Sequence, residues 1–131
     1  MKYLLTIYMD ESAYGDTTPE QARQVMAAYE AFGREVTEAG VMLGGEGLQA
    51  SDTATTVRVR DGETVTSDGP FADTREQLGG YYLLDCRDLD EAIGWAARIP
   101  GAQSGTVEVR PVMDYEAAGM STAGEAHEGA R

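Results

Sequence analysis

Two segments of the chain are apolar at both sets of alternating positions, a pattern typical of strands in the middle of a sheet. They are Lys2–Met9 (KYLLTIYM) and Tyr81–Cys86 (YYLLDC). A strand with one buried face alternates apolar and polar residues, whereas a strand covered on both faces reads as a nearly continuous apolar run. The sequence therefore predicts a sheet with these two strands at its centre and with both of its faces covered.

A helix signal follows each of these strands. In the first, Thr18 is the expected N-cap, Pro19 takes the first helical position, and Gln21 completes a capping box. Apolar residues then recur at spacings of three and four as far as Gly40, where a left-handed cap residue is expected. The predicted apolar stripe comprises Ala22, Val25, Met26, Tyr29, Phe32, Val36 and Ala39.

The second helix signal has Asp88 as its N-cap and Glu91 three residues later, and it ends at Pro100-Gly101. Its predicted buried stripe comprises Leu89, Ala92, Ile93, Ala96 and Ile99. Both helices are thus amphipathic, and each has one face to bury against a sheet.

The remaining strands are shorter. Val41–Leu43 is expected to end at the glycines around Glu46, and Thr106–Met113 alternates. Thr53–Arg60 and Glu63–Ser67 flank Asp61-Gly62, a strong two-residue hairpin turn. A loop or helical turn is expected from Asp68 to Gly80.

Without the hairpin, the element order is βαββαβ, which is the ferredoxin-like plan of the α+β class. In that plan the first and third core strands are central, in agreement with the two doubly apolar segments. We expect one domain over residues 1–113 and a flexible C-terminal tail over residues 114–131.

Two helices can cover only one face of such a sheet. The other face would expose an apolar patch of several hundred Å², more than soluble monomers usually tolerate. The sequence therefore predicts a homodimer packed sheet to sheet.

The charge balance excludes several kinds of partner. The chain has 10 Lys+Arg against 23 Asp+Glu and a formal net charge of −13, so neither nucleic acid nor a membrane surface is expected to bind it.

No apolar run is long enough to span a bilayer, and no signal-peptide pattern is seen. The single cysteine, Cys86, favours a reducing cytoplasm, and the Ala, Gly and Arg usage suits a GC-rich bacterium.

Several kinds of chemistry are also excluded. The only histidine, His127, lies in the predicted tail, so the domain has no Ser-His-Asp or Cys-His device. His/Cys clusters for zinc are absent, and the glycines around Glu46 lack the P-loop spacing, so no metal or cofactor is expected. A hard-cation site built only from carboxylates stays open, but no EF-hand spacing is present. Cys86 is interpreted as a small core residue rather than a nucleophile.

A few residues could serve a site, although each also has a plain structural explanation. Glu46, between three glycines, could contact a ligand or lie in a solvated loop. Tyr29 could orient a ligand or pack in the core. Asp68 could be an acid or base or only form a turn, and Phe71 could contact a ligand or close the end of the core. Arg75 could hold an anion or lie on an ordinary polar surface.

One stretch carries a more specific signature. Gly44–Gln49, the hairpin and above all Asp68–Tyr82 (DGPFADTREQLGGYY) resemble the DGPF-type branch of the YCII-related proteins. The resemblance covers about residues 1–113. It implies a dimeric α+β barrel of ferredoxin-like subunits. YCII-like members carry a His–Asp pair, and at least one relative removes chloride from a chlorinated hydroxyquinol. Alignment by eye places Tyr29 at the position of that histidine and Glu38 near its acidic partner.

Two functions stay open. The first is a cofactor-free lyase or isomerase with a cleft between the helix and sheet layers, in which Glu46 or Asp68 is the acid/base, Tyr29 orients the ligand and Arg75 holds an anion. The second is a non-catalytic ligand-sensing module. The resemblance implies a link to an extracytoplasmic-function sigma factor, and the missing histidine favours this second function.

Overall fold

The computed structural model describes residues 1–120 and contains one four-stranded antiparallel sheet with the order β2-β5-β1-β6. The helices and strands are β1 (Lys2–Met9), α1 (Pro19–Glu38), β2 (Met42–Gly47), β3 (Thr55–Arg60), β4 (Glu63–Asp68), β5 (Gln77–Asp85), α2 (Leu89–Arg98) and β6 (Thr106–Pro111). Short 3-10 turns, η1 (Glu11–Asp16), η2 (Ser51–Thr53) and η3 (Pro100–Ala102), connect them. Residues 121–131, which include His127 and most of the predicted tail, lie outside this description.

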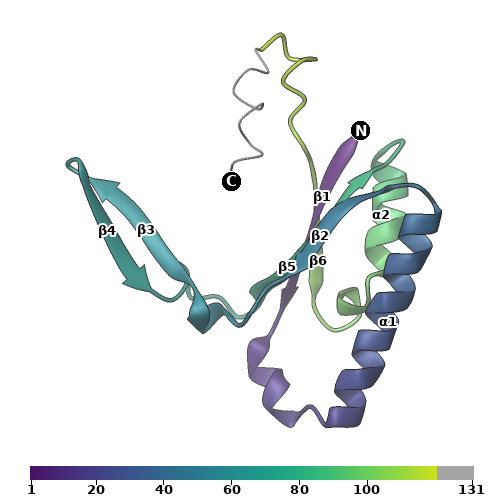
Figure 1. Ribbon diagram of the computed structural model, residues 1–131, viewed down its shortest axis with the longest axis horizontal. Coiled ribbons are helices and arrows are strands. Elements are labelled where there is room, and N and C mark those ends of the chain that lie inside the picture. Colours follow the sequence, from purple (N-terminus) through teal and green to yellow (C-terminus); the bar gives the residue numbers. More distant parts are fainter. Residues whose placement is uncertain (121–131) are drawn as a thin grey trace.

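The two doubly apolar strands, β1 and β5, are the central pair of the sheet, as predicted. Both helices lie against the same face of the sheet (Figure 1). The α+β class and the ferredoxin-like strand order are therefore confirmed for the described part of the chain.

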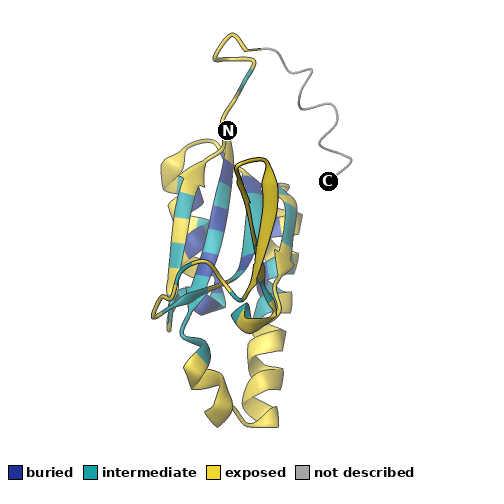
Figure 2. Ribbon diagram, turned by 90° about the vertical axis from the view of Figure 1, so that its left-hand side faces the viewer, coloured by how far each residue is buried: buried dark blue, intermediate teal, exposed yellow. Residues whose placement is uncertain are grey.

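The core lies between this face and the two helices. Tyr3, Leu5 and Ile7 of β1 point into it, and Phe32 of α1 contacts Tyr82 of β5 with ring centroids 5.0 Å apart. The other buried members are Val36, Val41, Leu84, Cys86, Ala92, Ala96 and Ile99. Buried residues alternate with less buried ones along β1, as the period of two in a strand requires (Figure 2).

Strands β2 and β5 extend further into glycine-rich sequence than predicted. Gly44–Gly47 belong to β2, and Gly79 and Gly80 belong to β5. A Cβ atom on Gly45 would lie 2.8 Å from Cδ1 of Tyr82, and one on Gly80 would lie 2.9 Å from the carbonyl oxygen of Glu46. The glycines therefore continue the sheet instead of ending it, and at Gly45 and Gly80 the neighbouring strand approaches too closely for a side chain.

Helix α1 begins at the predicted capping box, but its stripe is only partly covered. Phe32 and Val36 are buried and Tyr29 is half-buried, whereas residues 19–28 are exposed. The first turns of α1 extend past the end of the sheet together with η1 (Figures 1 and 2). Val25 and Met26 therefore have no sheet to pack against.

The hairpin of β3 and β4 forms its own two-stranded sheet. It projects away from the four-stranded sheet on the side opposite the helices (Figures 1 and 2). We call residues 55–68 the arm. The predicted alternation of Val57 and Val59 with Arg58 and Arg60 is present, but the side chains on both faces of the arm are exposed.

Candidate ligand-binding face

The face of the sheet turned away from the helices has no covering layer in the described chain; we call it the open face. Its position follows from the register, since directly opposed residues in antiparallel strands share a face. Leu4 pairs with Leu83, and Thr6 pairs with Tyr81, between the core residues of β1 and β5. These four side chains are half-buried, so the centre of the open face is mostly apolar.

Glu46 belongs to this open face. It pairs with Tyr81 across the β2–β5 ladder, and Tyr81 pairs with Thr6 on the far side. The exposed Glu46 carboxylate therefore lies at the edge of the apolar centre, in a strand and not in the solvated loop that was the alternative. A carboxylate beside a phenol ring can accept a hydrogen bond from a ligand whose ring packs on the apolar surface.

The other edge of the open face is charged. Glu108 and Arg110 of β6 are opposite Thr6 and Leu4, and they form an exposed ion pair of 3.5 Å. The open face thus has an apolar centre with polar groups on both edge strands.

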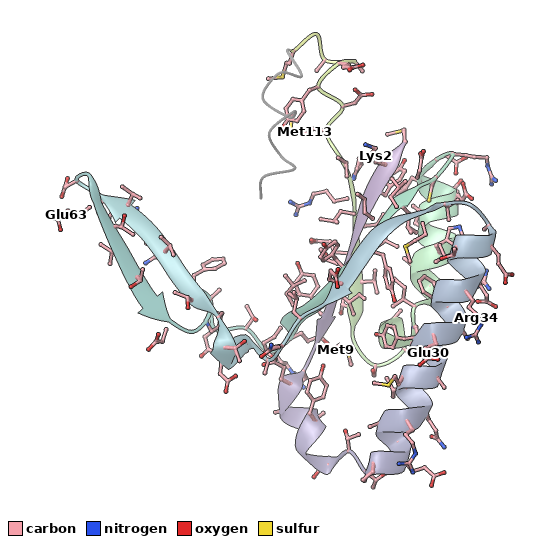
Figure 3. The ribbon with its side chains drawn as sticks, in the orientation of Figure 1. Lys2, Met9, Glu30, Arg34, Glu63 and Met113 are labelled. Atoms are coloured by element: carbon pink, nitrogen blue, oxygen red, sulfur yellow. The ribbon has the colours of Figure 1, made fainter. Side chains whose placement is uncertain are left out.

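Asp68 and Phe71 lie at the base of the arm. Asp68 ends β4 and is exposed, and Phe71, in the loop that follows, is 80% exposed. Phe71 therefore does not close the end of this subunit's core. The tip of the arm, marked by Glu63, is far from the sheet and the helices (Figure 3).

A small polar network holds the base of the arm to the body. The Glu11 carboxylate accepts hydrogen bonds from the backbone N–H and the hydroxyl of Ser51, at 2.8 and 2.6 Å. The backbone N–H of Glu11 in turn donates to Oε1 of Gln77 at 3.0 Å. This network joins η1, η2 and β5 beside the base of the arm.

Tyr29 lies on the opposite side of the sheet from Glu46. Its hydroxyl is so close to η3 that a Cβ atom on Gly101 would lie 2.7 Å from it. Burial raises the pKa of the Tyr29 phenol, and this outweighs the opposing effect of a hydrogen bond from the Gly101 backbone. Burial likewise raises the pKa of Tyr82 and Tyr14. These phenols are therefore neutral near pH 7 and are poor general bases.

The other two predicted site residues lie at separate places. Glu38 is the exposed last residue of α1. Arg75 is exposed in the loop before β5, near Asp10, whose pKa is lowered by hydrogen bonds from Ser12 and, to a smaller extent, by the charge of Arg75.

The six predicted site residues therefore do not form one cluster within the chain. The sheet separates Tyr29 from Glu46, so the expected cleft between helix and sheet layers does not contain both. Sequence reasoning also missed Tyr81, Glu11 and Ser51. The apolar pattern of β5 could have indicated Tyr81, but the contact of Glu11 with Ser51 bridges 40 positions and has no local signal.

Other kinds of site receive no support in residues 1–120. No group of three or more His, Cys, Asp or Glu side chains there could hold a metal ion. Cys86 is a buried free cysteine, and its pKa is raised by burial first and by Glu91 and Asp85 next. Among the described helices, none has the length and apolar character required to cross a bilayer.

The comparisons with known proteins agree with the family resemblance of the sequence. The model of the YCII-related domain matches residues 1–116, nearly all of the part described above. The chain belongs to the YCII-related family. A relative from Rhizobium meliloti (strain 1021), described as an uncharacterized protein, is 40% identical over 118 residues, which are 88% of this chain and 95% of the relative. The YCII-related assignment thus covers the sheet, both helices and the arm.

Proposed function

We propose that this YCII-related protein is a homodimer that binds a small organic molecule on its open face, between the two subunits. The observation that supports it best is the position of Glu46, a carboxylate beside Tyr81 at the rim of an uncovered apolar surface. Two sheets packed face to face lie about 10 Å apart and would enclose this surface as a dimeric α+β barrel. Binding sites of this kind combine apolar walls with a few polar groups.

The chemistry of the face favours a hydroxylated ring compound as the ligand. The ring would pack against Tyr81 and the leucines, and its hydroxyl would donate a hydrogen bond to Glu46. Asp68 and Phe71, at the base of the arm, would line the mouth of this space, and Arg75 would attract an acidic substituent. The lone buried Cys86 suits a reducing, cytoplasmic location.

The catalytic form of the proposal is a cofactor-free lyase or isomerase with Glu46 as the acid/base. Closure of the dimer would take Glu46 out of water and hold its carboxylate against the ligand, within reach of a proton that it could accept. Tyr29 and Glu38 lie outside the open face, and we give them no role in this reaction.

A second candidate is a regulatory module that binds the same ligand without converting it, in conjunction with an extracytoplasmic-function sigma factor. The specific observation in its favour is that the described residues include no histidine, the usual acid/base near pH 7. The net charge of −13 would suit a basic partner protein.

A ligand screen tests the proposal. The purified protein is heated with a panel of hydroxylated aromatic compounds and their acidic and halogenated analogues, and each mixture is analysed by mass spectrometry. A ligand at 100 times its Kd stabilises a protein by about 2.7 kcal/mol, which raises the melting temperature by several degrees. Glu46→Gln should abolish the shift, whereas Glu63→Gln at the arm tip should retain it.

The screen also separates the two candidates. A shift with conversion of the ligand identifies an enzyme, and its rate should fall by about 10²-fold or more in Glu46→Gln. A shift without conversion favours the regulatory module. An equal shift in wild type and Glu46→Gln would contradict the proposed site, and no shift with any compound would contradict the choice of ligand class.

A further inference from the structure

The arm has no packing partner in its own chain. Apart from Thr56, every residue of β3 and β4 is exposed, and Val57 and Val59 are 59% and 61% exposed. An isolated two-stranded hairpin is only marginally stable in water. The arm is nevertheless a regular hairpin, with six opposed residue pairs, that extends away from the body. Its order and its exposed valines both indicate a surface that packs against something else.

One face of the arm is suited to packing. Val57 is opposite Thr66, and Val59 is opposite Thr64, so one face carries four β-branched residues. We call it the arm valine face. The opposite face carries Arg58, Arg60 and Glu63 together with Thr56, Ser67 and the exposed Val65, so it is the more polar of the two. β-branched pairs form a flat apolar ladder that packs well on another apolar surface.

A matching apolar surface lies at the far edge of the sheet. Between α2, η3 and the edge strand β6 there is a shallow groove of about 260 Å³, which we call the edge groove. It is lined entirely by apolar side chains: Ile93, Ala96, Ala97, Ala102, Val107 and Val109. Ile93 is 49% exposed although it belongs to the predicted buried stripe of α2.

We propose that the arm valine face of each subunit docks in the edge groove of a second copy of this chain. The inference rests on the homodimer proposed above and adds where each arm lies. It takes the two-fold axis of the homodimer to be parallel to the strands, between the two face-packed sheets. Such an axis would place β2 of one subunit opposite β6 of its partner. The arm leaves the body next to β2, between the end of β2 and the start of β5. It therefore begins on the side where the partner's edge groove lies.

The length of the arm fits this arrangement. Six residues of β-strand span about 20 Å, and packed layers are about 10 Å apart. An arm that leaves its own sheet at an angle would therefore extend past the partner's sheet. It would reach the space between the partner's sheet and the partner's helices, where the partner's edge groove lies.

The contact area also favours a second copy. Four strands of about seven residues, about 4.8 Å apart, give the open face a flat area of roughly 440 Å². A stable interface buries about 800 Å² per partner. One face of the arm offers roughly 190 Å², and on docking it would cover a similar area of the partner, which includes the edge groove and its surroundings. Sheet and arms together come close to the standard size, whereas the sheet alone supplies about half of it.

Cross-linking across the proposed contact tests the inference. The double variant Val59→Cys/Ile93→Cys should form a covalent dimer under mild oxidation, because the two Cα atoms would be within disulfide reach only between subunits. The matched control, Arg58→Cys/Ile93→Cys, places the thiol on the other face of the same strand and should form at least tenfold less covalent dimer. Unmodified protein controls for Cys86, which is buried.

The outcomes separate this inference from the proposed function. A covalent dimer of Val59→Cys/Ile93→Cys without a covalent dimer of Arg58→Cys/Ile93→Cys supports arm docking. A dimer by light scattering with no cross-link, or with equal cross-linking of both variants, overturns the docking but leaves the homodimer intact. A monomer at micromolar concentration overturns both. Val57→Ser/Val59→Ser is a second test: it should weaken dimerisation at least tenfold with an unchanged circular dichroism spectrum, and unchanged dimerisation would contradict the docking.

Discussion

Gly101 occupies a position with no room for a side chain. A Cβ atom there would lie 2.7 Å from the Tyr29 hydroxyl, 3.0 Å from Cγ2 of Ile7 and 3.5 Å from the sulfur of Met9. The contact with Met9 would be ordinary, but Ile7 of β1 and Tyr29 of α1 would have to shift, which would disturb the packing between strand and helix. We expect Gly101→Ala to lower the free energy of unfolding by about 1–3 kcal/mol, as overpacking usually does. Urea denaturation of both proteins measures this change in the free energy of unfolding.

Gly94 provides the matched control. It lies within α2, is exposed, and has nothing within 4 Å of its ideal Cβ position. Gly94→Ala should raise the free energy of unfolding by about 0.5–1 kcal/mol, because alanine has the higher helix propensity. Equal effects of the two substitutions would show that space at Gly101 is not limiting.

The tyrosines predict how stability depends on pH. Burial raises the pKa of Tyr29, so the folded state favours the neutral phenol more than the unfolded state does. That contribution is fully present below the unfolded pKa of about 10 and is lost as pH rises through the higher folded value. Urea midpoints should therefore fall above about pH 10, and Tyr29→Phe should make this fall less steep. Tyr115→Phe, after the last strand, is the control, and an identical slope in all three proteins would contradict the assignment.

At the scale of elements, the exposed start of α1 depends on its capping box. Thr18 accepts a hydrogen bond from the Gln21 backbone at 3.1 Å, and the Gln21 side chain accepts one from the Thr18 backbone at 3.0 Å. Since residues 19–28 make little tertiary contact, Thr18→Ala should destabilise this segment by about 1 kcal/mol. Hydrogen exchange should become about fivefold faster for amides in the first turns of α1 and stay unchanged in β1 and β5.

Thr17→Ala, one residue earlier, is the control for this substitution and should leave exchange unchanged. Equal acceleration of β1, β5 and α1 in Thr18→Ala would mean that the start of the helix unfolds only together with the whole domain, contrary to this prediction.

At the scale of the whole molecule, the open face should decide the oligomeric state. Leu83, at its centre opposite Leu4, would face the partner's sheet. Leu83→Arg would place an unpaired charge in that interface, so the dimer Kd should rise by at least 100-fold. Met26→Arg adds the same charge on the exposed start of α1, where Met26 is 65% exposed, and should leave the Kd unchanged. Light scattering across a dilution series distinguishes them, and a similar loss of dimer in both would argue against the open face.

The sequence by itself determined the elements and their order. The two doubly apolar strands are central, the capping residues begin both helices, and Asp61-Gly62 forms the hairpin turn with positive φ at both positions. These features depend on neighbours in sequence, or on which faces of a strand are covered, so they can be read from the chain.

Only the tertiary structure decided what these elements place together. The glycines around Glu46 continue a strand that pairs with β5, and at Gly45 the ring of Tyr82 and the Tyr81 backbone leave no room for a side chain. Tyr29 and Glu46 appeared as members of one site, yet they lie on opposite faces of the sheet. At the base of the arm, Glu11 binds Ser51, which lies 40 positions later in the chain. Each of these features depends on contacts between distant segments, and no local pattern in the sequence encodes them.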